Sequence, residues 1–356
     1  MLDIKIYPAQ TKKEKPNDNA LGFGKFFTDH MFLMNYDTEN GWHDPRIVPY
    51  GPISLEPSAM VFHYAQEMFE GLKAYRTKDG GVQLFRPQKN IERMNNTNKR
   101  MCIPQVDPDD VLQAIKALVE YESDWVPSSE GTSLYIRPFI IATDAKLGVH
   151  ASHTYLFSII LSPVGSYYPE GINPVKIVVE TEYVRAVKGG TGFAKVGGNY
   201  AASLIGQEKA DSMGYAQVLW LDGIEHKYVD EVGSMNVFFV IGDEIITPSL
   251  TEGNILPGVT RASCLDLLRS KGFNVVERRL SIDEIMEASQ NGTLKEAFGT
   301  GTAAVISPIG ELNDGTQKII LNDGKIGPIA QMLYDTLTGI QWGNLDDEYG
   351  WIVKVK

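Results

Sequence analysis

A single lysine stands in a glycine-rich run, residues 189–200, which has five glycines in twelve residues. Lys195 has small and apolar neighbours in this run. Removal from water lowers the pKa of a lysine, and the neutral amine can then attack an aldehyde to form a Schiff base. The run is not a phosphate-binding P-loop, because no Gly-Lys-Ser/Thr sequence occurs in it. For this motif alone, an exposed lysine on a flexible loop is the commoner alternative.

Two further segments have the composition of anion-binding turns. Residues 299–304 match the G-x-G-x-x-G/A pattern of dinucleotide sites, but an expected strand and a proline follow where a helix is required. We therefore predict a tight turn that offers N–H groups and the hydroxyls of Thr300 and Thr302 to an anion, with an ordinary glycine turn as the alternative. Residues 256–260 lead into an expected helix, whose N-terminus can bind phosphate, unless Thr260 simply caps it.

Charged residues also occur next to apolar strands. Arg86 ends one such strand, where a fixed guanidinium suits a phosphate, although a surface arginine is the commoner case. Asp230 and Glu231 precede the apolar run 237–241, and a carboxylate at this place can pair with a protonated ring nitrogen, or be a solvated turn acid, which is more usual. His150 and His153 have the spacing of a metal pair, but no third ligand is evident, so we expect ordinary loop histidines.

The elements that must position these residues follow from short apolar runs and capping signals. In the first half, β-branched and aromatic runs separated by turns predict strands at 82–85, 133–142 and 154–161. Asp107 and Pro108 begin a helix with Val111, Ile115, Leu118 and Val119 on one face. In the second half, we predict strands at 175–179, 217–221 and 274–280, helices at 200–213 and 260–272, and a third helix capped by Ser281 and Glu284.

Strands and helices are mixed without regular alternation, which favours a two-domain α+β or α/β protein over a barrel of eight βα units. Prolines, glycines and tyrosines cluster after Leu161, and this composition predicts a connecting loop. We therefore expect a small N-terminal α/β domain over residues 1–165, an interdomain loop over 166–176, and a large C-terminal domain over 177–356 that carries Lys195.

The overall composition excludes several classes of protein. The 356 residues include 33 Lys and Arg against 45 Asp and Glu, a net charge of −12, which makes a nucleic-acid or anionic-membrane surface an improbable partner. Cys102 and Cys264 stand far apart, so neither a disulfide framework nor a thiolate zinc site is supported. No signal peptide or membrane-spanning run is apparent, and we expect a cytoplasmic protein.

Eight motifs follow one another in an order that resembles a known family. They are GFGKFFTDHM at 22–31, FEGLKAY at 69–75, LFRP at 84–87, SLYIRP at 133–138, KVGGNY at 195–200, EVGSMN at 231–236, LPGVTR at 256–261 and FGTGTAA at 298–304. This series is similar to the branched-chain amino acid aminotransferases, class IV aminotransferases of the fold-type IV enzymes that use pyridoxal 5′-phosphate. The resemblance covers residues 21–351 and implies the two-domain fold of D-amino acid aminotransferase.

The resemblance implies a function for each matching residue. Lys195 would bind the aldehyde of pyridoxal 5′-phosphate covalently and move the substrate proton. Glu231 would pair with the pyridine nitrogen, and Tyr200 would hydrogen-bond the phenolic oxygen. The groups that would hold the phosphate are Arg86, Val259, Thr260, Gly301 and Thr302. The residues that would line the substrate pocket are Phe23, Tyr64, Phe69, Tyr135, Arg137, Tyr167, Ser234 and Ala303, with Val149 supplied by the partner subunit of a homodimer.

The reaction implied is a reversible ping-pong transamination between Leu, Ile or Val and 2-oxoglutarate. It gives branched-chain 2-oxo acids and glutamate, with small molecules rather than nucleic acids or membranes as partners. The chemistry leaves open a lyase of the same fold, acting on aminodeoxychorismate, which would release pyruvate without an amino acceptor. It also leaves open a protein that keeps the scaffold without turnover.

Overall fold

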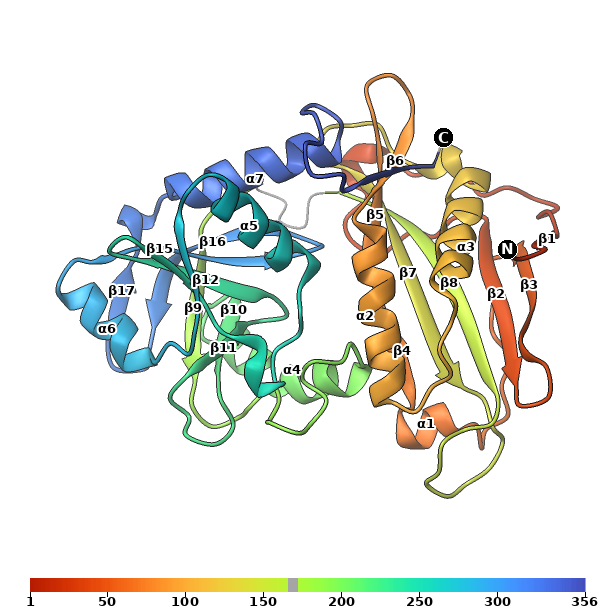
Figure 1. Cartoon of the computed structure of the whole chain (residues 1–356), viewed down its shortest axis with the longest axis horizontal. Helices are drawn as coiled ribbons and strands as arrows, with labels where there is room; N and C mark the ends of the chain where they lie inside the picture. Colours follow the sequence, from red (N-terminus) through yellow and green to blue (C-terminus); the bar gives the residue numbers. More distant parts are fainter. Residues whose placement is uncertain (166–171, 356) are drawn as a thin grey trace. The chain divides into compact units, whose positions relative to one another are not determined.

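The computed structural model describes residues 1–165 and 172–355, which form two compact units (Figure 1). Of the described residues, the first unit contains those up to 165, Ala194–Gly197 and those from Gly339 onward, and the second unit contains the rest. The segment around Lys195 thus belongs to the first unit, although the sequence analysis placed it in the C-terminal domain. The predicted interdomain loop at 166–176 lies partly outside the described residues, and its last two residues begin a strand, Val175–Glu180.

The first unit is built on a sheet to which nine strands contribute within the described residues. Its main path is β1 (Lys5–Ile6), β3 (Gly41–Pro49), β2 (His30–Asp37), β8 (Tyr155–Val164), β7 (Ser133–Ala142), β5 (Leu72–Arg76), β6 (Val82–Phe85) and β18 (Ile352–Lys354), and β4 (Glu67–Phe69) also pairs with β7. All neighbours are antiparallel except β1 and β3.

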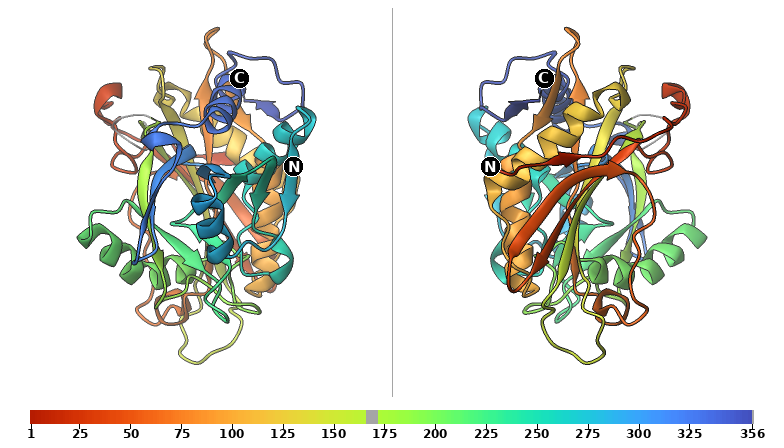
Figure 2. Two further views of the ribbon diagram at one scale, coloured as in Figure 1. Left: turned by 90° about the vertical axis from the view of Figure 1, so that its left-hand side faces the viewer. Right: turned by 90° about the vertical axis from the view of Figure 1, so that its right-hand side faces the viewer.

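Two long helices cover this sheet. α2 (Pro87–Arg100) and α3 (Pro108–Tyr121) lie next to each other on one of its faces (Figures 1 and 2). Their apolar residues, such as Met94 and Ile115, join Phe32 and Phe157 of the sheet in one buried core. The predicted cap of α3 is confirmed, since the Asp107 carboxylate accepts the N–H groups of the second and third helical residues. The shorter helices are α1 (Met60–Tyr64), η1 (Asp18–Ala20) and η2 (Ser123–Trp125).

The predicted strands of the first unit are confirmed at β6 and β7, whereas the end of β8 was predicted too early. The expected loop begins after Leu161, but β8 continues to Val164. Pro163 lies opposite Leu134 of β7, but β2, the other neighbour of β8, pairs only as far as Ile159. One side of β8 is therefore unpaired at Pro163, and a proline facing that side removes no hydrogen bond between strands.

The second unit also has a sheet to which nine described strands contribute. Its path is β11 (Val229–Val232), β10 (Gln217–Leu221), β9 (Val175–Glu180), β16 (Val305–Asn313), β15 (Leu294–Gly301), β12 (Asn236–Ile241), β13 (Glu244–Thr247) and β14 (Asn274–Glu277), with β17 (Lys318–Ile320) on β16. Parallel and antiparallel pairs are mixed, as at β9–β10 and β12–β15.

The helices of the second part of the chain are α4 (Gly197–Ser212), α5 (Val259–Ser270), α6 (Ile282–Gln290) and α7 (Pro328–Gln341), with η3 (Leu250–Glu252) and η4 (Asn322–Gly324). The predicted cap of α6 is confirmed, because Ser281 accepts the Glu284 N–H. α4 begins three residues earlier than predicted, within the glycine pair. No helix in the described part of the chain combines the length and apolar character needed to cross a membrane.

Candidate active site

Lys195 is fixed through its backbone to the first unit. Its N–H donates to Thr97 Oγ1 at 3.0 Å, and its carbonyl accepts the Phe69 N–H at 3.1 Å. The side chain lies with Nζ 4.6 Å from the centre of the Phe69 ring. Burial lowers the pKa of Lys195 to about 8, the positive charge of Arg93 adds to this effect, and Glu70 opposes it. The neutral, nucleophilic amine is therefore much more populated near neutral pH than at an ordinary exposed lysine, whose pKa is about 10.4.

A buried ion pair that the sequence analysis missed accompanies this lysine. Glu70 receives two bonds from Arg93, from Nε to Oε1 at 2.7 Å and from Nη2 to Oε2 at 2.9 Å. Asn90 and the Gly71 N–H also donate to Glu70 Oε2. Burial would raise the pKa of Glu70, but Arg93 outweighs it and holds that pKa below its usual value. The carboxylate is therefore ionised, and it supplies negative charge beside the Lys195 amine.

Four of the predicted substrate residues gather near the lysine in the first unit. The rings of Phe23 and Tyr135 meet edge to face at 5.0 Å, and the Arg137 guanidinium lies 4.8 Å from the Phe69 ring. Arg137 Nη2 donates to the Tyr135 hydroxyl at 3.1 Å. Arg137 Nε is buried and has no hydrogen-bond partner among the described residues. Aromatic surface and a buried cationic donor thus occur together, as a substrate with an apolar side chain and a carboxylate requires.

Arg86 and Tyr64 occupy other parts of the first unit. Arg86 precedes α2 in a left-handed conformation, φ 48° and ψ 42°, and its guanidinium lies 4.6 Å from the Trp351 ring. Its N–H donates to the Trp351 carbonyl at 2.7 Å, so the C-terminal segment fixes its direction. The Tyr64 hydroxyl accepts the Gly148 N–H at 2.7 Å, beside Val149, which is 87% exposed.

In the second unit, Glu231 is buried on β11 with both carboxylate oxygens contacted. Oε1 accepts the Leu256 N–H at 2.8 Å and lies 3.5 Å from Asn236 Nδ2. Oε2 lies 3.4 Å from Nε of Arg185, which is also buried. A cation and two donors favour the ionised form of this carboxylate. Arg185 is a further contributor that no sequence motif indicated.

The N-terminus of α5 lies beside Asn236. The N-cap is Gly258 and makes no side-chain cap, so the alternative in which Thr260 caps the helix is wrong. Val259 and Thr260 are the first helical residues, whose N–H groups cannot bond within the helix. Asn236 Nδ2 donates to the Leu256 carbonyl at 2.9 Å, and a Cβ on Gly258 would lie 2.0 Å from Asn236 Oδ1. This close packing explains the glycine.

The glycine turn 299–304 is confirmed as a strand-to-strand turn rather than a dinucleotide motif. β15 and β16 are antiparallel, with Gly301 opposite Val305, so residues 302–304 form the turn. Thr300 pairs with Asn236 across β15 and β12, which places this turn near Glu231. Thr300 Oγ1 is buried without a hydrogen-bond partner in the described part of the chain. The end of β15 thus lies near the α5 N-terminus, and Thr300 brings a hydroxyl that could bind an anion.

The remaining predicted residues are found as follows. Ser234 is exposed in the turn between β11 and β12, Ala303 is half-buried, and Tyr200 is half-buried in the first turn of α4. Tyr167 lies outside the described residues. His150 and His153 lie on the loop between β7 and β8, as expected. Each unit therefore brings together its own part of the predicted site.

Comparison with known proteins settles the family. The family model described as amino-transferase class IV matches residues 67–312, more than half of the chain. The chain belongs to the class IV aminotransferases. The resemblance stated from the motifs and the fold class expected from it are thereby confirmed for this aminotransferase.

The relatives of this aminotransferase include the branched-chain-amino-acid aminotransferase 2 of Bacillus subtilis, 59% identical over 99% of this chain and 97% of that protein. A probable branched-chain-amino-acid aminotransferase of Staphylococcus aureus is 56% identical over 99% of this chain and 98% of that protein. Among solved structures, the Escherichia coli branched-chain amino acid aminotransferase has a TM-score of 0.76 at 26% identity and covers 92% of this chain and 99% of its own. The T.th. branched-chain amino acid aminotransferase, solved with N-(5′-phosphopyridoxyl)-L-glutamate, has a TM-score of 0.75 at 26% identity. This match covers 92% of the present chain and 98% of the T.th. chain.

The lowered pKa of Lys195 predicts a distinct reactivity. In cofactor-free protein, the rate at which an aldehyde labels Lys195 should rise with pH and reach half its maximum near pH 8, because only the neutral amine attacks. An ordinary exposed lysine should have its midpoint near pH 10.4. Competitive labelling followed by peptide mass spectrometry measures both in one sample. A Lys195 midpoint equal to that of the exposed lysines would contradict the prediction.

Proposed function

We propose that this aminotransferase uses pyridoxal 5′-phosphate to transfer the amino group reversibly between Leu, Ile or Val and 2-oxoglutarate in a ping-pong reaction. The observation that carries the proposal is the Lys195 amine, with its pKa of about 8, beside Phe69 in a family of transaminases. The names of the bacterial relatives support the choice of branched-chain substrates.

The residues present fit the cofactor. Pyridoxal phosphate supplies an aldehyde that an amine can bind and a ring that withdraws electrons from the substrate Cα. Glu231 is held by Arg185 as an anion suited to a protonated ring nitrogen. Thr300 Oγ1 and the α5 N-terminus provide donors of the kind a phosphate needs. The residues that would hold the cofactor are Lys195, Tyr200, Glu231, Arg86, Val259, Thr260, Gly301 and Thr302.

The first unit supplies the groups that would bind the substrate. Phe23, Phe69 and Tyr135 offer the apolar surface on which a branched side chain would lie. Arg137, with its buried Nε, would bind the second carboxylate of glutamate or 2-oxoglutarate. A site with both features accepts the two unlike substrates of the reaction in turn. The further pocket residues proposed are Tyr64, Tyr167, Ser234 and Ala303.

The proton at the substrate Cα would be moved by the Lys195 amine. A pKa of about 8 allows this group to accept and return a proton near neutral pH at little cost. Thr97 and Phe69 hold the lysine backbone on both sides, so the amine is presented from a fixed position. The charges of Arg93 and Glu70 act on the Lys195 pKa in opposite directions, Arg93 lowering it and Glu70 raising it.

The test is a half-reaction followed by chemical trapping. Purified protein supplied with pyridoxal phosphate should show a visible absorption band that leucine shifts and 2-oxoglutarate restores. Borohydride reduction before leucine is added should attach the cofactor to the peptide that contains Lys195. A band that leucine leaves unchanged would overturn the proposed transamination, and release of pyruvate without an amino acceptor would indicate a lyase.

Gly71 should be required for the proposed substrate-binding residues Tyr135 and Arg137 to keep their positions. A Cβ at this position would lie 2.0 Å from the Tyr135 hydroxyl, which the Arg137 guanidinium also contacts. Gly71→Ala should therefore displace Tyr135 and reduce kcat/KM for leucine by about 10²-fold, since small misplacements have such effects. The matched control is Gly51→Ala, because nothing lies within 4 Å of a Cβ there. Equal kinetics for the two variants would contradict this account.

A homodimer in the cytoplasm is also part of the proposal. The exposed apolar residues Leu147, Val149 and Phe62, on the loop after β7 and on α1, are suited to burial against a second copy, and Val149 would reach the partner's pocket. Light scattering should give twice the mass of one chain, and a monomer at working concentration would contradict the dimer.

A further inference from the structure

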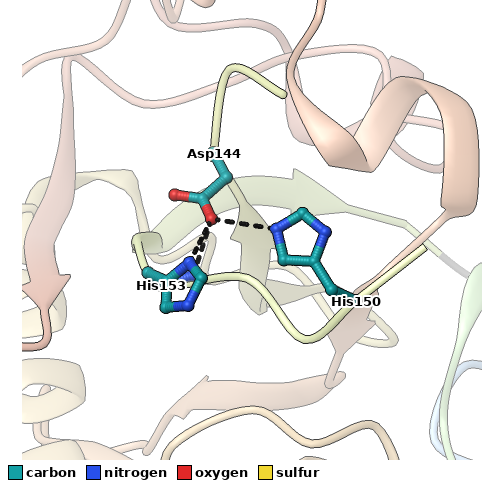
Figure 3. Close-up of side chains that lie close together, drawn as sticks. All are labelled: Asp144, His150 and His153. Carbon is teal, nitrogen blue, oxygen red and sulfur yellow. Dashed lines mark hydrogen bonds and ion pairs between the residues drawn. The ribbon is translucent and has the colours of Figure 1, made fainter. Parts of the chain in front are cut away.

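The loop between β7 and β8 brings three metal-ligating side chains together. Asp144, His150 and His153 each offer a ligand atom, and these atoms all lie within 4.8 Å of one another (Figure 3). Asp144 Oδ2 is 3.5 Å from His150 Nε2 and 2.9 Å from His153 Nδ1. The spacing of His150 and His153 marks them as a pair in the sequence, but the third member, Asp144, stands six residues before His150, outside any short motif.

The hydrogen bonds of His150 leave one ring nitrogen directed at the carboxylate. Nδ1 lies 2.7 Å from the Gly148 carbonyl, which only accepts, so Nδ1 carries the hydrogen. In the neutral ring, Nε2 then presents a lone pair. This atom is buried and has no hydrogen-bond partner in the described part of the chain. Two acceptors, Nε2 and Asp144 Oδ2, thus face each other, and a cation between them would bind both.

The same arrangement is typical of histidines that bind metals. A metal-binding histidine almost always donates its second ring N–H to a carbonyl or carboxylate, which fixes the ring, as Gly148 does for His150. Asp144 is held in a similar way, since Thr154 Oγ1 donates to its Oδ1 at 3.1 Å and the His153 N–H donates to Oδ2 at 2.9 Å.

The separations of the ligand atoms come close to those around a small tetrahedral ion, whose ligands, about 2.1 Å from the centre, lie about 3.4 Å apart. His150 Nε2 lies 3.5 Å from Asp144 Oδ2, and no pair of the three ligand atoms is more than 4.8 Å apart. The 2.9 Å contact between His153 Nδ1 and Asp144 Oδ2 is a hydrogen bond, which the ion would replace. Two imidazoles and one carboxylate are a set that zinc accepts, with water in the fourth place. His153 is exposed, so an ion can reach the group from solvent.

We propose that Asp144, His150 and His153 bind one Zn²⁺ ion through Oδ2, Nε2 and Nδ1. The ion links residue 144, just after β7, to residues 150 and 153, just before β8, and so closes the loop that contains Val149. Backbone bonds already join the base of this loop, where the Thr143 N–H donates to the Thr154 carbonyl at 3.0 Å. Zinc therefore restricts the exposed tip rather than the base.

The experiment measures metal binding directly and does not depend on transaminase activity. Tag-free protein carrying its cofactor, with Cys102→Ser to remove an exposed thiol, is freed of metal and titrated with Co²⁺ and then Zn²⁺. We expect the visible spectrum of tetrahedral Co²⁺, its loss on addition of one equivalent of Zn²⁺, and slower hydrogen exchange over residues 144–153. The Zn²⁺ dissociation constant should rise at least about tenfold in His150→Gln and in His153→Gln.

The control is a histidine–aspartate pair that has no third metal-ligating side chain close by among the described residues. His43 Nε2 lies 3.6 Å from Asp37 Oδ2, and His43→Gln should bind Zn²⁺ as the unsubstituted protein does. If His150→Gln fails to fold, His153→Gln remains decisive, because that side chain is 63% exposed and its replacement is tolerated. Equal Zn²⁺ affinity in all variants would overturn the proposal. Absence of Zn²⁺ binding in the unsubstituted protein would overturn it as well.

Discussion

Replacement of Lys195 by alanine is expected to lower the rate of leucine transamination by about 10³-fold or more. The substitution removes both the amine that would bind the cofactor and the group that would move the Cα proton, and proton transfer alone is worth about 10²–10⁴-fold. Stopped-flow measurement of the leucine half-reaction, with saturating cofactor, separates the chemical step from cofactor binding. Borohydride reduction of this variant should no longer attach the cofactor to the peptide that contains residue 195.

The matched control for this variant is the other strongly perturbed lysine of the same unit. Burial lowers the pKa of Lys73, on β5, to about 8 as well, but this residue lies outside the motif 195–200. Lys73→Met should keep the borohydride-trapped cofactor on Lys195. If the alanine variant of Lys195 retained near-normal turnover, the assignment of this residue would be wrong. If borohydride trapped the cofactor on Lys73 in the unsubstituted protein, the assignment of the cofactor to Lys195 would also be wrong.

Arg93→Leu is expected to lower the free energy of unfolding by about 3–5 kcal/mol. Both partners of the Glu70–Arg93 pair are buried, with side chains 1% and 7% exposed. Removal of the guanidinium leaves an uncompensated carboxylate in the core, and this is the costly case among ion-pair substitutions. Urea denaturation followed by fluorescence measures the loss.

The same helix provides the control for this prediction. Lys89 and Glu92 also form a 2.8 Å ion pair on α2, but their side chains are 50% and 60% exposed. Lys89→Ala should change stability by about 0–1 kcal/mol, because solvent screens exposed pairs. Glu70→Leu combined with Arg93→Leu should recover part of the loss, although Asn90 and the Gly71 N–H then lack their acceptor. Equal effects of Arg93→Leu and Lys89→Ala would show that burial of the pair is unimportant.

Much of this molecule could be predicted from local signals in the sequence. Strands β6, β7 and β10 were predicted residue for residue, since turns or prolines bound their apolar runs. The caps Asp107 and Ser281 were predicted because a capping side chain acts within three residues. The ordered motifs identified the family.

Interactions between distant residues could not be predicted in this way. Asn90, Arg93 and Thr97 follow helical spacing and look like the solvated face of α2, yet all three are buried and contact Glu70 or Lys195. Arg185 precedes its partner Glu231 by 46 residues, so no local pattern connects them. The end of β8 was misplaced because the tolerance for Pro163 depends on which strands flank it.

The first unit is assembled from segments that lie far apart in the sequence, so it cannot fold completely while the chain is still being synthesised. Its edge strand β18, Ile352–Lys354, pairs with β6, and Ile352 lies opposite Phe85, which stands 267 residues earlier in the chain (352 − 85). During synthesis the N-terminal part emerges first, but its sheet stays incomplete at this edge until residues 352–354 have left the ribosome. Arg86, at the end of β6, likewise lacks Trp351 until then. A nascent chain stalled before residue 350 should therefore be unable to orient the arginine that is proposed to hold the phosphate.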